Sequence, residues 1–174
     1  MWKYIAGFVL AMSIAAQGQG ITSAPKEQLA FLSQDSFTAS APLPQDVLKI
    51  LLRQPLVRDS MERASHKDKR NPAQLFRAIQ VHLINPNDID LFIVGIAPIS
   101  GADNGWFWIV RAARRNPRIV LFATGYSLEL LGSRTNGYHD IQSSWSNPNG
   151  TETRTYKFEG TRYKLSRERW NERR

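Results

Sequence analysis

A polar loop just ahead of two tryptophans carries the side chains best suited to binding chemistry. Residues 97–105 read APISGADNG, and Trp106 and Trp108 would share one face of the strand that follows. Loops held by a rigid sheet are common binding sites, and tryptophan combines a large contact area with a hydrogen-bonding edge. We therefore expect binding residues in and beside this loop, namely Ser100, Asp103, Asn104, Trp106, Arg111, Arg114 and Arg115.

The same two tryptophans also have a structural interpretation, as core residues. Trp106 and Trp108 would then face one layer of the fold, while Phe107 and Ile109 would face a second layer. A two-layer β fold needs large apolar side chains in its interior. For that reason we favour the core interpretation over ligand contact.

Four arginines between residues 111 and 118 form a basic patch that contains no acid. Cations beside exposed aromatic rings could bind single-stranded nucleic acid, through phosphate contacts and base stacking. They would equally attract anionic lipid head groups or acidic polymers of a cell envelope. Nucleic acid is disfavoured if the protein is exported, and a solvated basic surface that only maintains solubility is the simplest interpretation.

The sequence contains no recognised catalytic motif. It has no GxSxG, no HExxH, no Gly-rich phosphate loop before a helix and no cysteine. A serine triad or a pair of carboxylic acids can be assembled on paper, but any domain of this size offers as much. The residues concerned are Ser100, His82 and Asp90 for the triad, and Asp103 with Asp140 or Glu129 for the pair. We predict no catalytic residue, no metal and no cofactor, and an enzyme stays open as the weaker alternative.

The elements that must position these residues are mostly strands. From Pro72 onwards apolar and polar residues alternate in short runs, and turn sequences such as NPND, SRTNG and NPNG separate the runs. This pattern predicts a mainly β fold, an antiparallel meander of sandwich-like or propeller-blade-like type with about eight strands. The predicted strands are 75–83, 89–96, 105–111, 118–124, 126–131, 138–145, 151–158 and 162–165.

The order of apolar and polar residues within the strands refines this prediction. Residues 89–96 and 118–124 are apolar on both faces, so both strands should be central in a sheet. Residues 151–158 alternate instead, which places Tyr156 and Phe158 inside and the intervening polar side chains outside.

Helical periodicity precedes the strands, over residues 44–72. Pro44 stands near a first helical turn, and apolar residues from Val47 to Leu52 form an amphipathic stripe. Pro55 interrupts this helix, a second turn or helix is expected up to about Ala64, and residues 65–72 should be an exposed charged connection. The short helix should cover one face or one open edge of the sheet. Residues 21–43 are predicted to be a flexible leader, residues 73–166 the β domain, and residues 167–174 a basic tail.

The amino-terminal residues 1–20 have the three zones of a secretory signal peptide. Lys3 precedes an apolar stretch of thirteen residues from Tyr4 to Ala16, and small residues follow. Cleavage after Ala15, Gly18 or Gly20 fits equally well. The stretch is shorter than the roughly 20 residues of a membrane-spanning helix, so we expect a periplasmic or secreted protein with no transmembrane segment after cleavage.

The absence of cysteine from all 174 residues limits the chemistry further. Exported proteins often contain disulfides because their compartment is oxidising, but this fold must be held by its core alone. Thiol catalysis, cysteine-bound metals and a lipid-anchored mature form are excluded as well. The net charge of +8 favours acidic partners.

The carboxyl-terminal part carries a sequence signature. TNGYHDI (135–141) followed by YKFEGTRY (156–163) resembles a TNGYxDI…YxFxGxxY pattern of small uncharacterised secreted bacterial proteins, and is remotely similar to FG-GAP and VCBS-type repeats. The resemblance implies a β-meander and no activity. It does not carry over calcium binding, because Ile89 interrupts the acidic stretch 85–90 and no distal Glu completes a cage.

The residues of this signature also have a plain structural role. Asn136 and Gly137 tolerate positive φ and predict a tight turn, and Asp140 is placed to accept backbone N–H bonds that close it. His139 should be packed or half exposed rather than a metal ligand, since it would share a strand face with Ile141 and Trp145.

Taken together, the sequence predicts an exported, non-enzymatic binding or inhibitor-type protein of the bacterial cell envelope. The alternatives are a hydrolase acting on an envelope polymer, or polyanion binding (nucleic acid or lipid head groups) through the arginine patch. The partner would be an unknown envelope protein or a polyanion, and peripheral contact with a membrane is left open.

Overall fold

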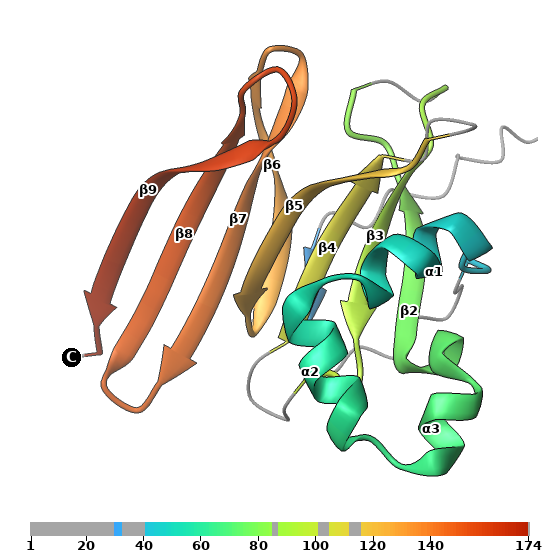
Figure 1. Ribbon diagram of the computed structural model, residues 1–174. Coiled ribbons are helices and arrows are strands. Elements are labelled where there is room, and N and C mark those ends of the chain that lie inside the picture. The colour runs from blue at the N-terminus through green and yellow to red at the C-terminus, as the bar shows by residue number, and fades with distance from the viewer. Residues whose placement is uncertain (1–29, 33–40, 85–86, 101–104, 112–115, 174) are drawn as a thin grey trace, which may run out of the picture.

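The computed structural model has three layers: helices, a four-stranded sheet and a five-stranded sheet (Figure 1). All strand pairs are antiparallel. This confirms the predicted mainly β, antiparallel fold with a short helical segment. The structure describes residues 30–32, 41–84, 87–100, 105–111 and 116–173. The predicted signal peptide lies outside these residues.

The helical layer covers one face of the four-stranded sheet (Figure 1). Asp46 lies in the first turn of the first helix, where the helix dipole favours an acid, and the side chains of Val47, Leu48 and Leu51 are buried. A proline at the first position opens the second helix, since its missing N–H would have no partner there. The elements are α1 (Gln45–Leu52), α2 (Pro55–Arg63), α3 (His66–Arg70) and a 3₁₀ turn (Pro72–Leu75).

Residues 65–72 are largely exposed, as predicted, but residues 66–70 within this connection form the helix α3. The hydroxyl of Ser65 accepts a hydrogen bond from the Asp68 amide (3.3 Å) and donates one to the Asp68 carboxylate (2.6 Å). A serine followed by an acid three residues later is a capping arrangement that starts a helix. This signal is present in the sequence, but the surrounding charges masked it.

The four-stranded sheet is the central layer, with the strand order β2-β3-β4-β5. Every residue of β3 is buried, which confirms that this strand is central. The prediction that residues 118–124 are also central is wrong, because β5 is an edge strand of this sheet and Phe122 is 38% exposed. The strands are β2 (Phe76–Val81), β3 (Asp90–Gly95), β4 (Gly105–Arg111) and β5 (Arg118–Gly125).

Strand β4 shows why both faces of this sheet are apolar. Phe107 and Ile109 belong to the core between the two sheets, whereas Trp108 belongs to the core between the sheet and the helices. All three side chains are at most 1% exposed. The core interpretation of Trp108 is therefore confirmed, and Trp106 packs partly buried on the helix side.

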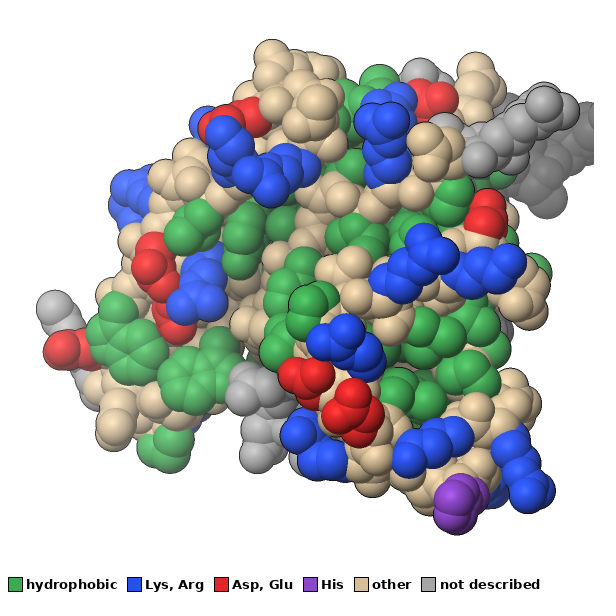
Figure 2. Space-filling model, in the orientation of Figure 1, with side chains coloured by type: hydrophobic (Ala, Val, Ile, Leu, Met, Phe, Trp, Pro, Cys, Tyr) green, Lys and Arg blue, Asp and Glu red, His purple; other side chains and the backbone are tan. Residues whose placement is uncertain are grey.

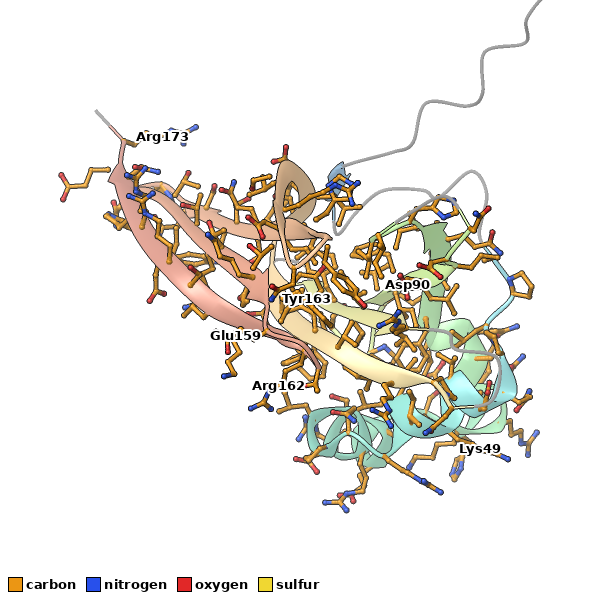
Figure 3. All side chains as sticks on the ribbon, turned by 90° about the horizontal axis from the view of Figure 1, so that it is seen from above. Lys49, Asp90, Glu159, Arg162, Tyr163 and Arg173 are labelled. Atoms are coloured by element: carbon orange, nitrogen blue, oxygen red, sulfur yellow. The ribbon has the colours of Figure 1, made fainter. Side chains whose placement is uncertain are left out.

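The five-stranded sheet has the order β1-β6-β7-β8-β9. Its inner face contributes Tyr156 and Phe158 to the core between the sheets, as predicted, together with Tyr163. In Figure 3, Tyr163 points from β9 into this interior, and Glu159 and Arg162 lie in the turn before it. The strands are β1 (Ala30–Leu32), β6 (Ser127–Thr135), β7 (Tyr138–Asn147), β8 (Gly150–Phe158) and β9 (Tyr163–Glu172).

Two predicted boundaries are wrong. Strand β9 continues to Glu172, so most of the predicted basic tail 167–174 is part of the sheet. Within the predicted flexible leader 21–43, residues Ala30–Leu32 form strand β1, which pairs with β6. Strand β1 is only three residues long, and most residues of β9 after Leu165 are charged, so neither segment has the longer apolar run that marks the other strands.

Part of the five-stranded sheet extends beyond the four-stranded sheet. Figure 1 shows most of β8 and β9 to the left of β5, where neither the helices nor the four-stranded sheet covers them. Residues 164–172 of β9 are accordingly exposed. We call this part of the sheet, formed by β7, β8 and β9, the overhang. In the described part of the chain, the helices are all too short to cross a membrane.

Candidate functional site

Three residues of the predicted loop site, Ser100, Trp106 and Arg111, lie among the described residues, and each of them packs against other parts of the fold. Ser100 is buried, and its hydroxyl donates a hydrogen bond to the carbonyl of Gly95. Trp106 packs edge-on against Trp108, with 6.3 Å between the ring centres. The remaining loop and patch residues, Asp103, Asn104, Arg114 and Arg115, lie outside the described residues.

The side chain of Arg111 makes contacts within the fold rather than pointing freely into solvent. Its guanidinium donates a hydrogen bond to the Tyr138 hydroxyl and lies 5.3 Å from the centre of that ring. Arg111 is also directly opposite Asp90 across the β3–β4 ladder. Asp90 is 1% exposed, and burial raises the pKa of its carboxyl group to about 6, although the charge of Arg111 lowers it in part. The predicted role of Arg111 in surface binding has no support from this geometry.

The predicted tight turn is present between β6 and β7. Asn136 and Gly137 have φ values of 52° and 83°, the two positive values that a two-residue hairpin turn needs. The Asn136 amide also donates to the carbonyl of Phe158 (2.9 Å). Asp140 differs from the prediction, because its carboxylate accepts a hydrogen bond from the Ser133 hydroxyl (2.8 Å). It is 3% exposed, so it is a buried structural residue.

His139 is half-buried on β7, as predicted. Its Nδ1 lies 2.6 Å from the carbonyl oxygen of Leu131, and its Nε2 contacts Arg134. Among the residues that the structure describes, no three side chains of the types His, Cys, Asp and Glu gather closely enough to hold a metal ion.

The inner face of the overhang gathers functional side chains that the sequence did not reveal as a site. Across β7, β8 and β9, Trp145, Glu152 and Trp170 lie directly opposite one another, and so do Ser143, Arg154 and Glu168. Residues that are opposite in antiparallel strands share a face. Both rows continue the face that carries Tyr156 and Phe158, and their side chains are partly or fully exposed, apart from the buried Ser143.

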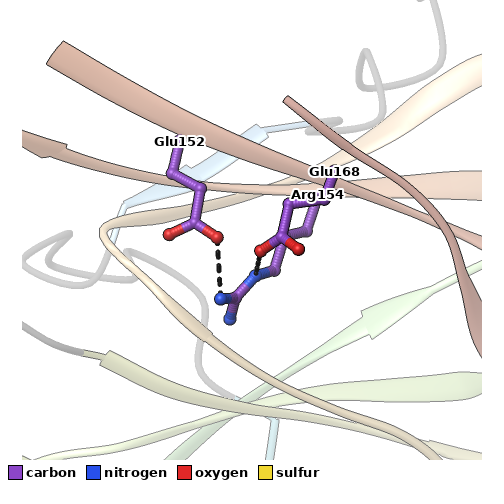
Figure 4. A network of polar contacts seen from close by, with 3 residues as sticks. All are labelled: Glu152, Arg154 and Glu168. Atoms are coloured by element: carbon purple, nitrogen blue, oxygen red, sulfur yellow. Dashed lines mark hydrogen bonds and ion pairs between the residues drawn. The ribbon is translucent and has the colours of Figure 1, made fainter. Parts of the chain in front are cut away.

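Charged groups at the centre of this face form a network (Figure 4). Arg154 contacts the carboxylate of Glu152 at 2.7 Å and that of Glu168 at 2.9 Å. The hydrogen bond with Glu168 raises the pKa of Glu152, whereas hydrogen bonds with Glu152 and Arg154 lower the pKa of Glu168. Two carboxylates thus hold the guanidinium in a fixed orientation on a rigid sheet.

Tryptophans flank this network. The rings of Trp145 and Trp170 are 6.5 Å apart at an interplanar angle of 39°, and Trp170 is 45% exposed. Figure 2 shows large hydrophobic side chains beside acidic and basic ones over this part of the sheet. A depression of about 260 Å³ lies between the network and the end of β5, and its lining residues are Thr124, Gly125, Ser143, Trp145, Glu152 and Arg154.

A second, larger groove of about 490 Å³ follows β5 on the same side of the molecule. Phe122 and Leu165, which are 38% and 52% exposed, form part of its walls. Arg162 and Lys164 also line it. The overhang therefore offers a polar site with aromatic walls and, beside it, a more apolar one.

No family model, curated protein or solved structure matches this chain. The resemblance to secreted proteins with the TNGYxDI…YxFxGxxY signature, and to FG-GAP or VCBS-type repeats, stays a prediction. The overhang can be interpreted only from its own residues.

The site on the overhang could not be predicted from the sequence, because its residues become neighbours only through the register of the paired strands. Trp145 and Trp170 are 25 positions apart, and an extra residue in β9, Ser166, decides which side chains of that strand face inwards. A bulge of this kind changes the face of every residue beyond it. The alternation in RERW (167–170) is the signal that indicates a strand in the segment predicted as a basic tail.

Proposed function

We propose that the protein is an exported, non-enzymatic binding protein of the cell envelope, and that its ligand site is the inner face of the overhang. The observation that carries the proposal is the fixed Arg154 between Glu152 and Glu168, with Trp145 and Trp170 beside it. These groups are open to solvent on one side and rigidly supported on the other. Aromatic and arginine side chains in such positions are typical of binding hot spots.

The chemistry of the site favours a ligand with a flat, partly apolar face and several hydroxyl groups. The tryptophan rings can cover C–H groups of such a ligand, while the guanidinium donates and the carboxylates accept hydrogen bonds. A depression of about 260 Å³ is small for a ligand pocket, so it would take one ring at a time. We propose a sugar residue of an envelope glycan.

The hydrolase alternative gains no support from the residues first considered for it. Asp140 is 3% exposed and bonded to Ser133. Glu129 is exposed on β6, opposite Gln142, and Asp103 lies outside the described residues. In the overhang, Arg154 bonds to both carboxylates, an arrangement that suits binding.

The binding proposal can be tested with soluble neutral oligosaccharides, such as chitotetraose and maltotetraose, by calorimetry and tryptophan fluorescence. We expect at least one of them to bind, and Trp170→Ala to weaken that binding by about tenfold or more. Arg154→Met should have a similar effect. Leu56→Ala is the matched control, because Leu56 is 47% exposed but lies on α2. Equal affinities for the parent protein and the Trp170 variant would reject the site.

Export needs a separate test, because the ligand site could exist in any compartment. The protein should be recovered from the periplasm or the medium, and its first residue should follow Ala15, Gly18 or Gly20. Material found in the cytosol with Met1 intact would contradict export and would leave the binding experiment unaffected.

A further inference from the structure

The outer face of β8 and β9 has a chemistry opposite to that of the inner face. Because Tyr156 and Phe158 point inwards, the alternate residues of β8 point outwards. The strand register places a β9 residue beside each of them on the same face. The opposed pairs are Lys157 with Lys164, Thr155 with Arg167, Thr153 with Arg169, and Thr151 with Asn171.

On β8 and β9, the acidic side chains are confined to the inner face. The acids Glu152 and Glu168 lie on the inner face, whereas this register leaves no acid on the outer face of the two strands. Among the described residues, Lys164 has an ion-pair partner in Glu159, but Arg167 and Arg169 have no carboxylate within ion-pair distance. Lys157 and Lys164 stand directly opposite each other, which is unfavourable in an isolated sheet.

We propose that this outer face of β8 and β9 docks on an anionic lipid surface. Three of its cations lie on β9 and one, Lys157, lies on β8, and the threonine hydroxyl groups of β8 stand beside them in the same layer. These side chains can contact several phosphate head groups at once. Attraction between clustered Lys or Arg residues and an anionic membrane surface grows with each cation. The docked sheet would present its inner, tryptophan-bearing face away from the lipid.

A nucleic-acid strand fits this surface less well than lipid does. Binding of a single strand relies on bases that stack on exposed aromatic rings among the cations. The aromatic residues of β8 and β9, namely Tyr156, Phe158, Tyr163 and Trp170, all lie on the inner face. The outer face can therefore offer charge and hydroxyl groups but no stacking.

The test is co-sedimentation of the full chain with vesicles of phosphatidylcholine alone or with 30% phosphatidylglycerol. The variant is Arg167→Glu with Arg169→Glu. Its control is Lys67→Glu with Arg70→Glu on α3, which makes the same change in net charge on the helical layer. Since each cation near an anionic surface contributes about a fivefold factor in affinity, the β9 variant should bind anionic vesicles at least about thirtyfold more weakly. The control should bind nearly as the parent does.

Residues 1–29 are common to all variants, so any contribution from the apolar stretch Tyr4 to Ala16 is the same in each of them. Binding through the outer face should also weaken strongly in 0.5 M salt. A second variant, Arg167→Gln with Arg169→Gln, removes the two charges without reversing them. It replaces the first variant if far-UV circular dichroism shows that charge reversal disturbs the fold.

Three results would overturn the proposal: equal loss in the α3 control, no loss in either β9 variant, or binding to a DNA oligonucleotide without binding to anionic vesicles. The oligosaccharide affinity of the β9 variants should equal that of the parent protein. This readout separates failure of the docking proposal from failure of the proposed ligand site.

Discussion

At the residue scale, burial strongly changes the acidity of Asp90. It is 1% exposed, its Oδ2 atom has no hydrogen-bond partner among the described residues, and burial raises the pKa of its carboxyl group to about 6. The unfolded chain should titrate near the ordinary value of 3.8. Between these two pH values the folded protein therefore binds a proton that the unfolded chain has released.

From this difference we predict a pH dependence of stability. The contribution of Asp90 is most favourable below about pH 4 and is lost as the pH rises through about 6, and the loss is at most about 3 kcal/mol. Urea denaturation of the parent protein and of Asp90→Asn at several pH values measures this contribution to the free energy of unfolding. The stability of the parent relative to the variant should fall between pH 4 and 6. A constant difference over that range would contradict the assignment.

The sequence correctly predicts which side of a sheet a residue faces where the alternation of side chains along a strand alone decides it. Phe107, Trp108 and Ile109 alternate between two cores as their order in the chain requires. The sequence did not reveal that Arg111 turns towards Tyr138, because that contact joins β4 to β7 across the two sheets. Side chains that meet through tertiary packing leave no local pattern in the sequence.

At the scale of elements, Gly125 is the residue that allows the chain to pass from one sheet to the other. It ends β5 immediately before β6, and the neighbouring Tyr126 amide donates to the carbonyl of Ser144 (2.7 Å). A Cβ atom on Gly125 would stand 2.6 Å from that same carbonyl oxygen. Real Cβ atoms do not approach backbone oxygen so closely, so β5 and β7 could not keep their present separation.

We predict that Gly125→Ala lowers the free energy of unfolding by about 2 kcal/mol or more, through this backbone clash. Gly132→Ala on β6 is the matched control, because a Cβ atom there would meet nothing within 4 Å. Thermal unfolding followed by circular dichroism compares the two. Similar midpoints for both variants would show that the sheet junction can relax.

The elements themselves were largely predictable, because turn residues divide the chain into runs. All eight strands after residue 75 appear near their predicted positions. The errors fall at the edges of the sheets. Strand β1 has only three residues, and the second half of β9 is mostly charged. The apolar β5 lies at an edge because it leads directly into the five-stranded sheet. Edge position depends on strand order, which local sequence does not contain.

At the scale of the whole molecule, the two cores share one sheet. The four-stranded sheet contributes Trp108 to the helix-side core and Phe107 to the core between the sheets. Neither core can be lost without exposing one face of that sheet. We therefore expect the described part of the chain to unfold as one cooperative unit.

Leu51→Ala tests this expectation. Leu51 on α1 is 0% exposed, and its truncation should cost about 2–5 kcal/mol. Tryptophan fluorescence and far-UV circular dichroism should give one coincident transition, shifted as a whole to lower urea concentration. Leu56→Ala, at a position that is 47% exposed, should leave the midpoint nearly unchanged. Two separate transitions in the Leu51 variant would show that the helical layer can detach by itself.

The two edges of the five-stranded sheet differ in how readily they could pair with a strand of another molecule. At one end β1 covers β6 with the chain's own backbone, while at the other β9 has no neighbouring strand. Two copies that approached each other along β9 would bring the guanidinium groups of Arg167 and Arg169 together, a common protection against fibril growth. Dissolved ions weaken this repulsion. Ordered aggregation, if it occurs, should therefore begin in concentrated salt rather than in dilute buffer.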